Sequence, residues 1–209
     1  MISKNELIAI VELSINNLID AFQKAPYTFY TESDLHSHLF NQIYSRLPPE
    51  KWLCATPSGE SILIHREYPT KERYSRKSLI EGLENGSRGH FDLVIWNPEK
   101  TMERIFRTSS QDFEKEEQTF IAIEFDLKEN SANDDSAIHH LRWDLMKLQG
   151  LRNEVEKGYI LAFGRNWAFE RDFLNRAKQF SGMEEKVTIL YVSDNKFVQL
   201  SKRALSNRA

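Results

Sequence analysis

Phe120-Ile121-Ala122-Ile123-Glu124-Phe125-Asp126-Leu127-Lys128 is the stretch that decides the fold, because it joins an apolar run to charged residues. Its β-branched and aromatic residues predict a strand from Phe120 to Leu127. Side chains alternate between the two faces of a strand, so Glu124, Asp126 and Lys128 should share one face. An unpaired buried carboxylate is costly. The stretch is therefore either an exposed sheet edge, with Lys128 neutralising its neighbours, or part of a site that holds a cation.

The rest of the chain supplies helices and strands around this central strand. Apolar residues at helical spacing predict helices over 5–24 and 31–47, with Thr31 as the N-cap of the second helix and Asp34 close to completing a capping box. Strands are expected over 61–68 and 91–96, joined by a basic stretch with a helical turn at 78–83. Further along we expect a helix over 136–156, a strand over 159–163, a helix over 167–181, and strands over 187–192 and 197–200. This order predicts an α/β domain whose mixed sheet has helices on both faces.

Asp92 interrupts a second apolar run, Phe91-Asp92-Leu93-Val94-Ile95-Trp96. It could be a structural aspartate that accepts hydrogen bonds from backbone donors at a strand start. Alternatively, it could lie beside Glu124 and Asp126 on the neighbouring strand, where clustered carboxylates repel each other unless a cation joins them. Hard oxygen ligands of this kind select Mg²⁺ or Mn²⁺. The pattern thus predicts a metal site built from Asp92, Glu124 and Asp126.

Two further carboxylates, Glu67 and Glu32, are candidates for the same site. Glu67 follows the apolar part of the first strand, where a surface salt bridge is the alternative interpretation. Glu32 lies in the first turn of the second helix, on the same face as Leu35 and Leu39 of its core stripe. Stabilisation of the helix dipole is the alternative interpretation of Glu32.

Basic residues cluster between the first two predicted strands. The candidates for phosphate contacts are Arg66, Lys71, Arg73, Arg76, Lys77 and Arg88, with tyrosines interleaved and several glutamates among them. The alternative is a solvated charged loop. The formal net charge of −3 excludes a basic coat for nucleic acid but leaves such local contacts open.

The composition limits the classes to which the chain can belong. Its 209 residues, 40% of them hydrophobic and 28% charged, are typical of a globular protein, and we expect a single domain over 1–209. No apolar run approaches the ~20 residues that a membrane-spanning helix needs. The N-terminus lacks a small-residue signal cleavage site, and the lone Cys54 excludes an internal disulfide. We therefore expect a cytoplasmic protein without a membrane partner.

The order of these elements resembles the PD-(D/E)xK nuclease superfamily, which includes restriction endonucleases and Holliday-junction resolvases. The resemblance covers about 31–165. It rests on a leading helix with Glu32, on Gly89-His90-Phe91-Asp92 as the first motif, and on Glu124-Phe125-Asp126-Leu127-Lys128 as the second. The helix that carries Asp144 and Lys147 is also similar. The resemblance implies a restriction-endonuclease-like mixed sheet with core order αβββαβ. An extra helix would precede this core, a helix and strands would follow it, and a charged insertion would occupy 97–118.

The same resemblance implies Mg²⁺- or Mn²⁺-dependent hydrolysis of phosphodiester bonds in nucleic acid, in DNA rather than RNA. Asp92 with Glu124 or Asp126 would hold the metal, and Lys128 would orient the attacking water. Glu67 and Glu32 would complete a second metal site or its surroundings. Many nucleases of this fold act as dimers, which allows for a homodimer here.

The sequence departs from the family pattern at the lysine. Asp126-Leu127-Lys128 is an intact motif, but if Glu124 is the acid, then Asp126 takes the place of the lysine and Lys128 must substitute for it. The alternative function is therefore a catalytically degenerate protein of this fold that serves as a nucleic-acid-binding or assembly module. A third hypothesis is an unrelated α/β interaction protein with solvated acids. The histidines provide no metal pair at i,i+4 spacing, and His36 and His38 are given no role.

Overall fold

The structure, a computed structural model, describes residues 2–56, 59–74, 87–98, 119–128, 134–150, 153–165 and 186–199. Its centre is a six-stranded sheet of order β3-β4-β5-β6-β7-β8. The strands are Ile64–Tyr74, Ser87–Trp96, Thr119–Lys128, Lys157–Gly164, Val187–Val192 and Phe197–Gln199, in that order. β5, β6 and β7 run parallel, and the other neighbours are antiparallel. The predicted mixed sheet is thus confirmed.

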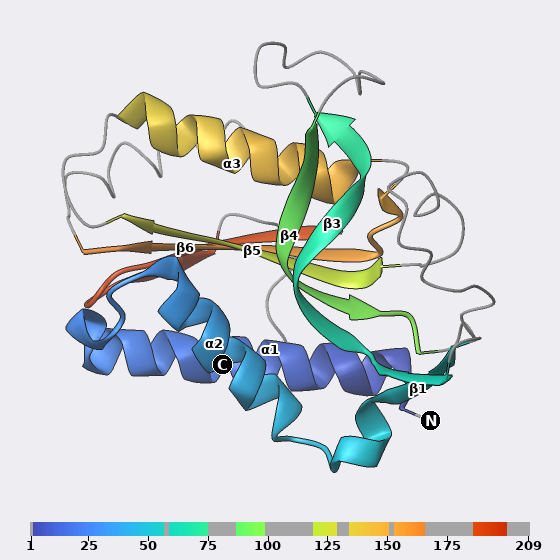
Figure 1. Ribbon diagram of the computed structural model, residues 1–209. Helices are drawn as coiled ribbons and strands as arrows, with labels where there is room; N and C mark the ends of the chain where they lie inside the picture. Colours follow the sequence, from blue (N-terminus) through green and yellow to red (C-terminus); the bar gives the residue numbers. More distant parts are fainter. Residues whose placement is uncertain are drawn as a thin grey trace.

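Helices cover both faces of this sheet (Figure 1). α1 (Lys4–Lys24) and α2 (Glu32–Tyr44) lie on one face, and α3 (Asp134–Gln149) lies on the other. α1 is long because a continuous apolar stripe, from Leu7 through Ile15 to Phe22, is fully buried against the sheet side of the molecule. β6 and β7 are buried along their whole length, as expected for parallel strands covered on both faces.

The start of α2 carries the predicted cap. The Thr31 hydroxyl accepts a hydrogen bond from the Asp34 N–H at 3.3 Å, and the Asp34 carboxylate accepts one from the Thr31 N–H at 2.8 Å, which completes a capping box. The helix ends at Tyr44 rather than at 47. Residue 48 is a proline and has no N–H for the Tyr44 carbonyl, which instead accepts the indole N–H of Trp52 at 2.8 Å.

The predicted strand over 61–68 is wrong as a single strand, because it divides at Leu63. β2 (Gly59–Ile62) forms a separate hairpin with β1 (Leu53–Thr56), which was not predicted and which follows the short 3₁₀ helix η2 (Pro49–Trp52). Leu63 joins the two sheets, since its N–H donates to the Trp52 carbonyl at 2.7 Å and its carbonyl accepts the Trp96 N–H at 2.9 Å. β3 then begins at Ile64 and runs longer than predicted.

The predicted helix over 136–156 begins at Asp134 and ends earlier, at Gln149. The Asn153 side-chain amide donates to the Lys147 carbonyl at 2.7 Å and so satisfies one of the carbonyls that a helix end leaves exposed. The predicted turn at 78–83, the predicted insertion from residue 99 onward and the predicted helix at 167–181 lie outside the described residues. Among the described helices, none combines the length and apolarity needed to cross a membrane.

Candidate functional site

β4 and β5 pair over only part of their length, and the gap where they separate is the centre of the candidate site. Their pairs run from Trp96↔Thr119 to Leu93↔Ile123. Beyond this point β5 stays paired with β6 as far as Lys128↔Gly164, while β4 continues beside β3 as far as Ser87↔Tyr74. Figure 1 shows the β3–β4 ribbon leaving the sheet and rising past α3. The edge of β5 that faces the gap therefore loses its strand partner after Ile123.

Two carboxylates take the backbone donors that this separation leaves on β5. The Phe125 N–H donates to Oδ2 of Asp92 at 2.7 Å, and the Leu127 N–H donates to Oε1 of Glu32 at 3.1 Å. Buried backbone donors are almost always paired, because leaving them unpaired is costly. Asp92 thus accepts a backbone donor, although it lies within β4 rather than at a strand start, and the same contact holds its carboxylate in the gap next to Glu124.

Glu124 occupies the α3 side of the gap and is 1% exposed. Its Oε2 accepts a hydrogen bond from Nζ of Lys147 at 2.6 Å. The same ammonium lies 3.0 Å from Oδ1 of Asp144 and donates to the His90 carbonyl at 3.1 Å. Lys147 therefore ties α3 to β4 and β5 at one point. Oε1 of Glu124 has no hydrogen-bond partner within the described residues.

This cluster places three carboxyl groups, those of Asp92, Glu124 and Asp144, around a single ammonium. Burial raises the pKa of Asp92 to about 7, against the opposing effects of the Phe125 N–H and of Lys147. Burial also raises the pKa of Glu124 and of Asp144, although Lys147 lowers both. Burial disfavours the charge on Lys147 too, but Glu124 and Asp144 outweigh it and raise the pKa of the ammonium. Lys147 therefore stays charged, and the surplus carboxylates suit a further cation.

α2 places His36 on the opposite side of Asp92. The imidazole packs against the Phe125 ring with 4.6 Å between centroids. Its Nε2 lies 3.6 Å from Oδ2 of Asp92, and its Nδ1 lies 3.8 Å from Oε1 of Glu67 on β3. Burial lowers the pKa of His36, so a salt bridge to Glu67 is weak at neutral pH. Glu67 has φ +50°, a left-handed conformation that is strained for any residue but glycine.

The structure brings most of the predicted acids together. Asp92, Glu124, Glu32 and Glu67 all reach the gap, with contacts as described above. Asp126 is buried on the α3 side of β5, the side of Glu124, since alternate residues share a face. The side chain of Lys128 lies outside the described residues, so its role stays a prediction.

Two side chains at the gap, Lys147 and His36, were not predicted as site residues. Asp144 and Lys147 are at i,i+3 on α3, and Asp144 lies within the apolar stripe of Leu141 and Leu148, a position where a charge needs a reason. His36 similarly precedes Leu39 by three residues on the buried face of α2. A polar residue within a core stripe is the signal in both helices. It identifies His36 directly, and it identifies Lys147 as the ion-pair partner of Asp144.

No family model, curated protein or solved structure matches this chain. The chemistry of the site therefore has to be argued from its own geometry.

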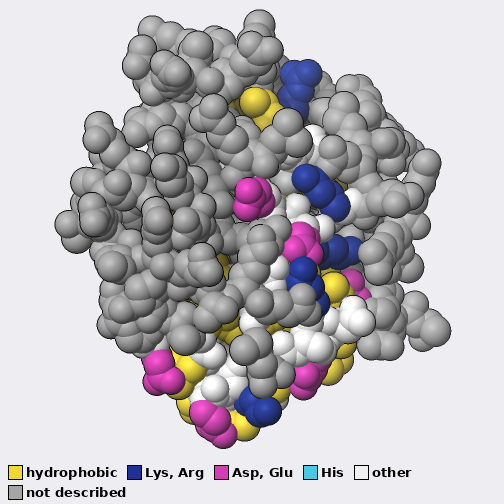
Figure 2. Space-filling view, turned by 90° about the vertical axis from the view of Figure 1, so that its right-hand side faces the viewer, with side chains coloured by type: hydrophobic (Ala, Val, Ile, Leu, Met, Phe, Trp, Pro, Cys, Tyr) yellow, Lys and Arg dark blue, Asp and Glu magenta, His cyan; other side chains and the backbone are white. Residues whose placement is uncertain are grey.

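The predicted nucleic-acid-binding residues are only partly described. The Arg66 guanidinium donates to Oγ of Ser37 at 3.1 Å and to Oγ of Ser33 at 3.3 Å, so it lies along α2 near the gap. Arg73 and Arg88 are paired across β3 and β4. The side chains of Lys71, Arg73 and Arg88, and all of Arg76 and Lys77, lie outside the described residues. On the face in Figure 2, the Lys and Arg side chains that are coloured alternate with Asp and Glu.

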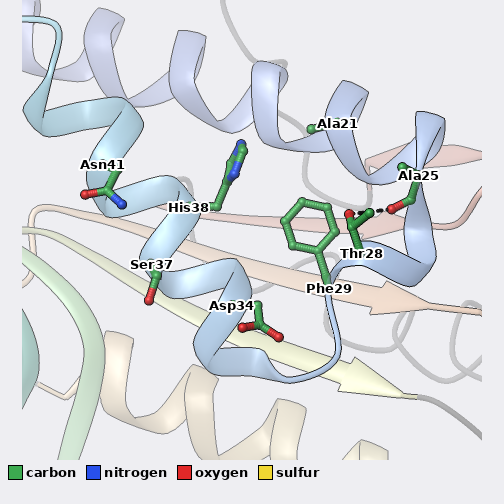
Figure 3. Close-up of a pocket in the computed structure, with 8 residues that line it drawn as sticks. All are labelled: Ala21, Ala25, Thr28, Phe29, Asp34, Ser37, His38 and Asn41. Atoms are coloured by element: carbon green, nitrogen blue, oxygen red, sulfur yellow. Dashed lines mark hydrogen bonds between the residues drawn. The ribbon is translucent and has the colours of Figure 1, made fainter.

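A separate open pocket of about 500 Å³ lies between the end of α1, the 3₁₀ helix η1 (Pro26–Thr28) and α2. Figure 3 shows Phe29 and His38 at its centre, with Asp34 and Ser37 nearer the start of α2. Asp34 is engaged in the capping box, and His38 lies 2.7 Å from the Gln42 side-chain amide. His36 and His38 project about 200° apart around the helix. The pocket is therefore on a different face of α2 from the carboxylate cluster.

Proposed function

We propose that the chain is a divalent-metal-dependent nuclease of the PD-(D/E)xK type, with Asp92 and Glu124 as its acids and Lys147 as its lysine. One observation carries this proposal. Asp92 and Glu124 flank the gap between β4 and β5, and the Lys147 ammonium lies 2.6 Å from Glu124 in the same buried site. Carboxylate oxygens beside a lysine form a donor set that fits Mg²⁺ or Mn²⁺.

The order of elements around the gap supports the same proposal. The elements α2, β3, β4, β5, α3 and β6 follow one another as helix, three strands, helix and strand, with the short 3₁₀ helix η2 and the small β1–β2 hairpin between α2 and β3. This is the αβββαβ order that the resemblance implies. Glu32 is the first residue of α2 and touches β5, so the leading helix brings its glutamate to the gap.

The geometry favours Glu124 over Asp126 as the second acid. Glu124 comes directly after the last β4–β5 pair and contacts the lysine, whereas Asp126 is two residues further from that pair. Asp126 then occupies the place of the motif lysine, and α3 supplies the ammonium from Lys147 instead. The departure from the family pattern is thus one of position along the chain, while the charge at the site is kept.

These groups have distinct roles in phosphodiester hydrolysis. Asp92 and Glu124 would hold the divalent ion, which when bound acts as a Lewis acid on the phosphate and activates water. Lys147 would position that water and offset negative charge that develops on the phosphate oxygens. Glu32 accepts the Leu127 N–H and so satisfies a backbone donor on the edge of β5 that faces the gap.

Cleavage of labelled oligonucleotides of random sequence tests the proposal without a known recognition site. Single-stranded DNA, duplex DNA and RNA would be incubated with Mg²⁺ or Mn²⁺, with EDTA as the blank. We expect cleavage of DNA that Glu124→Gln and Lys147→Met each slow by about 100-fold or more, the usual cost of losing a group that stabilises transition-state charge. Lys4→Met is the matched control, because Lys4 forms an exposed ion pair with Glu156 at 2.9 Å, away from the gap.

Loss of Lys147 leaves two buried carboxylates unpaired, which costs about 3–5 kcal/mol. Circular dichroism and thermal melts must therefore show that Lys147→Met is folded at the assay temperature. Glu124→Gln is the milder change, because Lys147 keeps Asp144 as its partner. Metal binding without cleavage of any substrate would contradict the nuclease proposal and favour the degenerate binding module.

A further inference from the structure

His36 is a buried polar side chain whose ring nitrogens have no hydrogen-bond partner among the described residues. Its residue is 4% exposed, and neither Nδ1 nor Nε2 has a hydrogen bond within the described part of the chain. Native proteins rarely leave such atoms unsatisfied, and each case calls for an explanation such as an ion. The ring cannot turn freely toward solvent, because it is packed against Phe125 with 4.6 Å between centroids.

The two ring nitrogens face two carboxylates at distances that are too long for hydrogen bonds. Nε2 lies 3.6 Å from Asp92 and Nδ1 lies 3.8 Å from Glu67. One atom from each of His36, Glu67 and Asp92 can be chosen so that all three lie within 4.8 Å of one another. That spacing leaves room for an ion between the three side chains, with small adjustments of the exposed Glu67.

Three separate elements hold these side chains in place. The capping box orients the start of α2 and hence His36. The Phe125 N–H holds Asp92 on β4. Glu67 on β3 keeps φ +50° between the pairs Arg66↔Leu93 and Tyr68↔Phe91, which places it level with Asp92 on the adjacent strand.

We propose that His36, Glu67 and Asp92 form a binding site for a first-row transition-metal ion, for which Mn²⁺ serves as the spectroscopic probe, with imidazole as the ligand that selects against Mg²⁺ and Ca²⁺. The use of this ion in catalysis rests on the proposed nuclease function, but its binding does not. Asp92 belongs both to this site and to the Asp92–Glu124 pair of the proposed nuclease site, so the two sites lie next to each other.

The donor set explains the preference. Imidazole is a common ligand of transition metals, whereas Mg²⁺ and Ca²⁺ take oxygen ligands. A ligand histidine must be neutral, and burial lowers the pKa of His36 in that direction. One ring nitrogen can then bind the ion while the other donates its N–H to a carboxylate, as histidine ligands commonly do.

Electron paramagnetic resonance of bound Mn²⁺ tests this inference directly on the full chain. Titration gives the dissociation constant, and electron spin echo modulation detects a coordinated ¹⁴N nucleus. We expect nitrogen modulation in the wild type, which changes to the ¹⁵N pattern when histidine is labelled. We expect His36→Ala to lose the modulation and to bind Mn²⁺ at least tenfold more weakly, with the affinity for Mg²⁺ changed less than threefold.

His38→Ala is the matched control, because His38 lies on the same helix but faces the separate pocket shown in Figure 3. It should keep both the modulation and the affinity. His36→Gln, which fills a similar volume, guards against a folding defect in the alanine variant and should also lose the modulation.

Two results would overturn the inference. One is Mn²⁺ bound to the wild type without nitrogen modulation, and the other is no Mn²⁺ binding at all. Both are independent of cleavage. Nitrogen modulation without cleavage of any substrate would support the metal site and contradict the nuclease function. Mg²⁺-dependent cleavage without nitrogen modulation would support the nuclease function and contradict the metal site.

Discussion

The side chains at the gap are charged groups held where burial makes charge costly. Asp92 and Glu124 are both carboxylates on neighbouring strands, yet Lys147 contacts Glu124 at 2.6 Å while Asp92 relies on a backbone N–H at 2.7 Å. Burial is the largest cause that raises the pKa of Asp92 to about 7, and it outweighs both the Phe125 N–H and Lys147. Burial also raises the pKa of Glu124 well above its usual range, despite the ammonium beside it. Both acids therefore hold a proton more tightly than a free carboxyl does, and a metal ion that binds them would displace it.

The raised pKa of Asp92 predicts how stability depends on pH in the absence of metal. The carboxyl binds its proton more tightly in the folded chain, with a pKa of about 7, than in the unfolded chain, where its pKa has the ordinary value of 3.8. Its stabilising contribution is therefore fully present below pH 4 and is lost as pH rises toward 7, by up to about 1.4 kcal/mol per pH unit. Asp92→Asn keeps a carbonyl oxygen for the Phe125 N–H but removes the charge. The free energy of unfolding of the variant, minus that of the wild type, should therefore increase by about 2–3 kcal/mol between pH 5 and pH 8.

Urea unfolding in EDTA at these two pH values measures that difference. Comparing variant with wild type cancels the titration of shared groups that do not interact with Asp92. Parallel stability profiles for the two proteins would show that Asp92 does not have the raised pKa.

At the scale of elements, the separation of β4 from β5 makes the site. It frees the N–H groups of Phe125 and Leu127, which bind Asp92 and Glu32, and it opens a space into which α2 and α3 can each send a side chain. On the other edge of β5 the parallel pairing with β6 is unbroken as far as Gly164. The continuous pairing with β6, which itself pairs with β7, thus fixes the position of β5 and of Glu124.

Two glycines of β6 offer a matched test of how tightly β6 packs against its neighbours. A Cβ at Gly164 would collide with the hydroxyl end of Tyr191, a fully buried ring on β7 that cannot move aside. A Cβ at Gly158 would meet Cδ1 of Leu148 at 3.1 Å and Cγ2 of Val187 at 3.3 Å, which are side-chain ends that can yield. We expect Gly164→Ala to cost about 1–3 kcal/mol of unfolding free energy and Gly158→Ala about 1 kcal/mol or less. Urea titration ranks the two variants, and a larger cost at Gly158 would contradict this account of the packing.

At the scale of the whole molecule, the gap joins the two helical layers. α2 and α3 lie on opposite faces of the sheet (Figure 1), yet His36 of α2 and Lys147 of α3 both approach Asp92 or Glu124. An ion bound at the gap would hold both layers through the same strands. Metal binding should therefore stabilise the entire domain.

Thermal melts with and without Mn²⁺ measure this linkage. A ligand at 100 times its dissociation constant adds about 2.7 kcal/mol, which corresponds to a rise of roughly 5–10 °C in Tm for a domain of this size. Asp92→Asn, which loses a ligand shared by both sides of the gap, should show little or no rise. An equal rise in wild type and variant would place the stabilising ion elsewhere.

Much of the fold and some of the site could be predicted from local sequence. Apolar runs located β4, β5, β6 and β7 near their observed positions, and Thr31 with Asp34 located the start of α2. Side-chain alternation placed Glu124 and Asp126 on one face of β5. These properties depend on a few neighbouring residues, so they can be read without knowing how distant segments meet.

Only the tertiary structure decided which distant groups meet at the gap. The division at Leu63 depends on hydrogen bonds to Trp52 and Trp96, and the choice of Lys147 as the partner of Glu124 depends on where α3 crosses the sheet. His36 gained its two carboxylate neighbours in the same way, from the path of β3 and β4 past α2. Such contacts join residues far apart in the chain, and their geometry follows from packing over the whole sheet, which no local pattern of residues encodes.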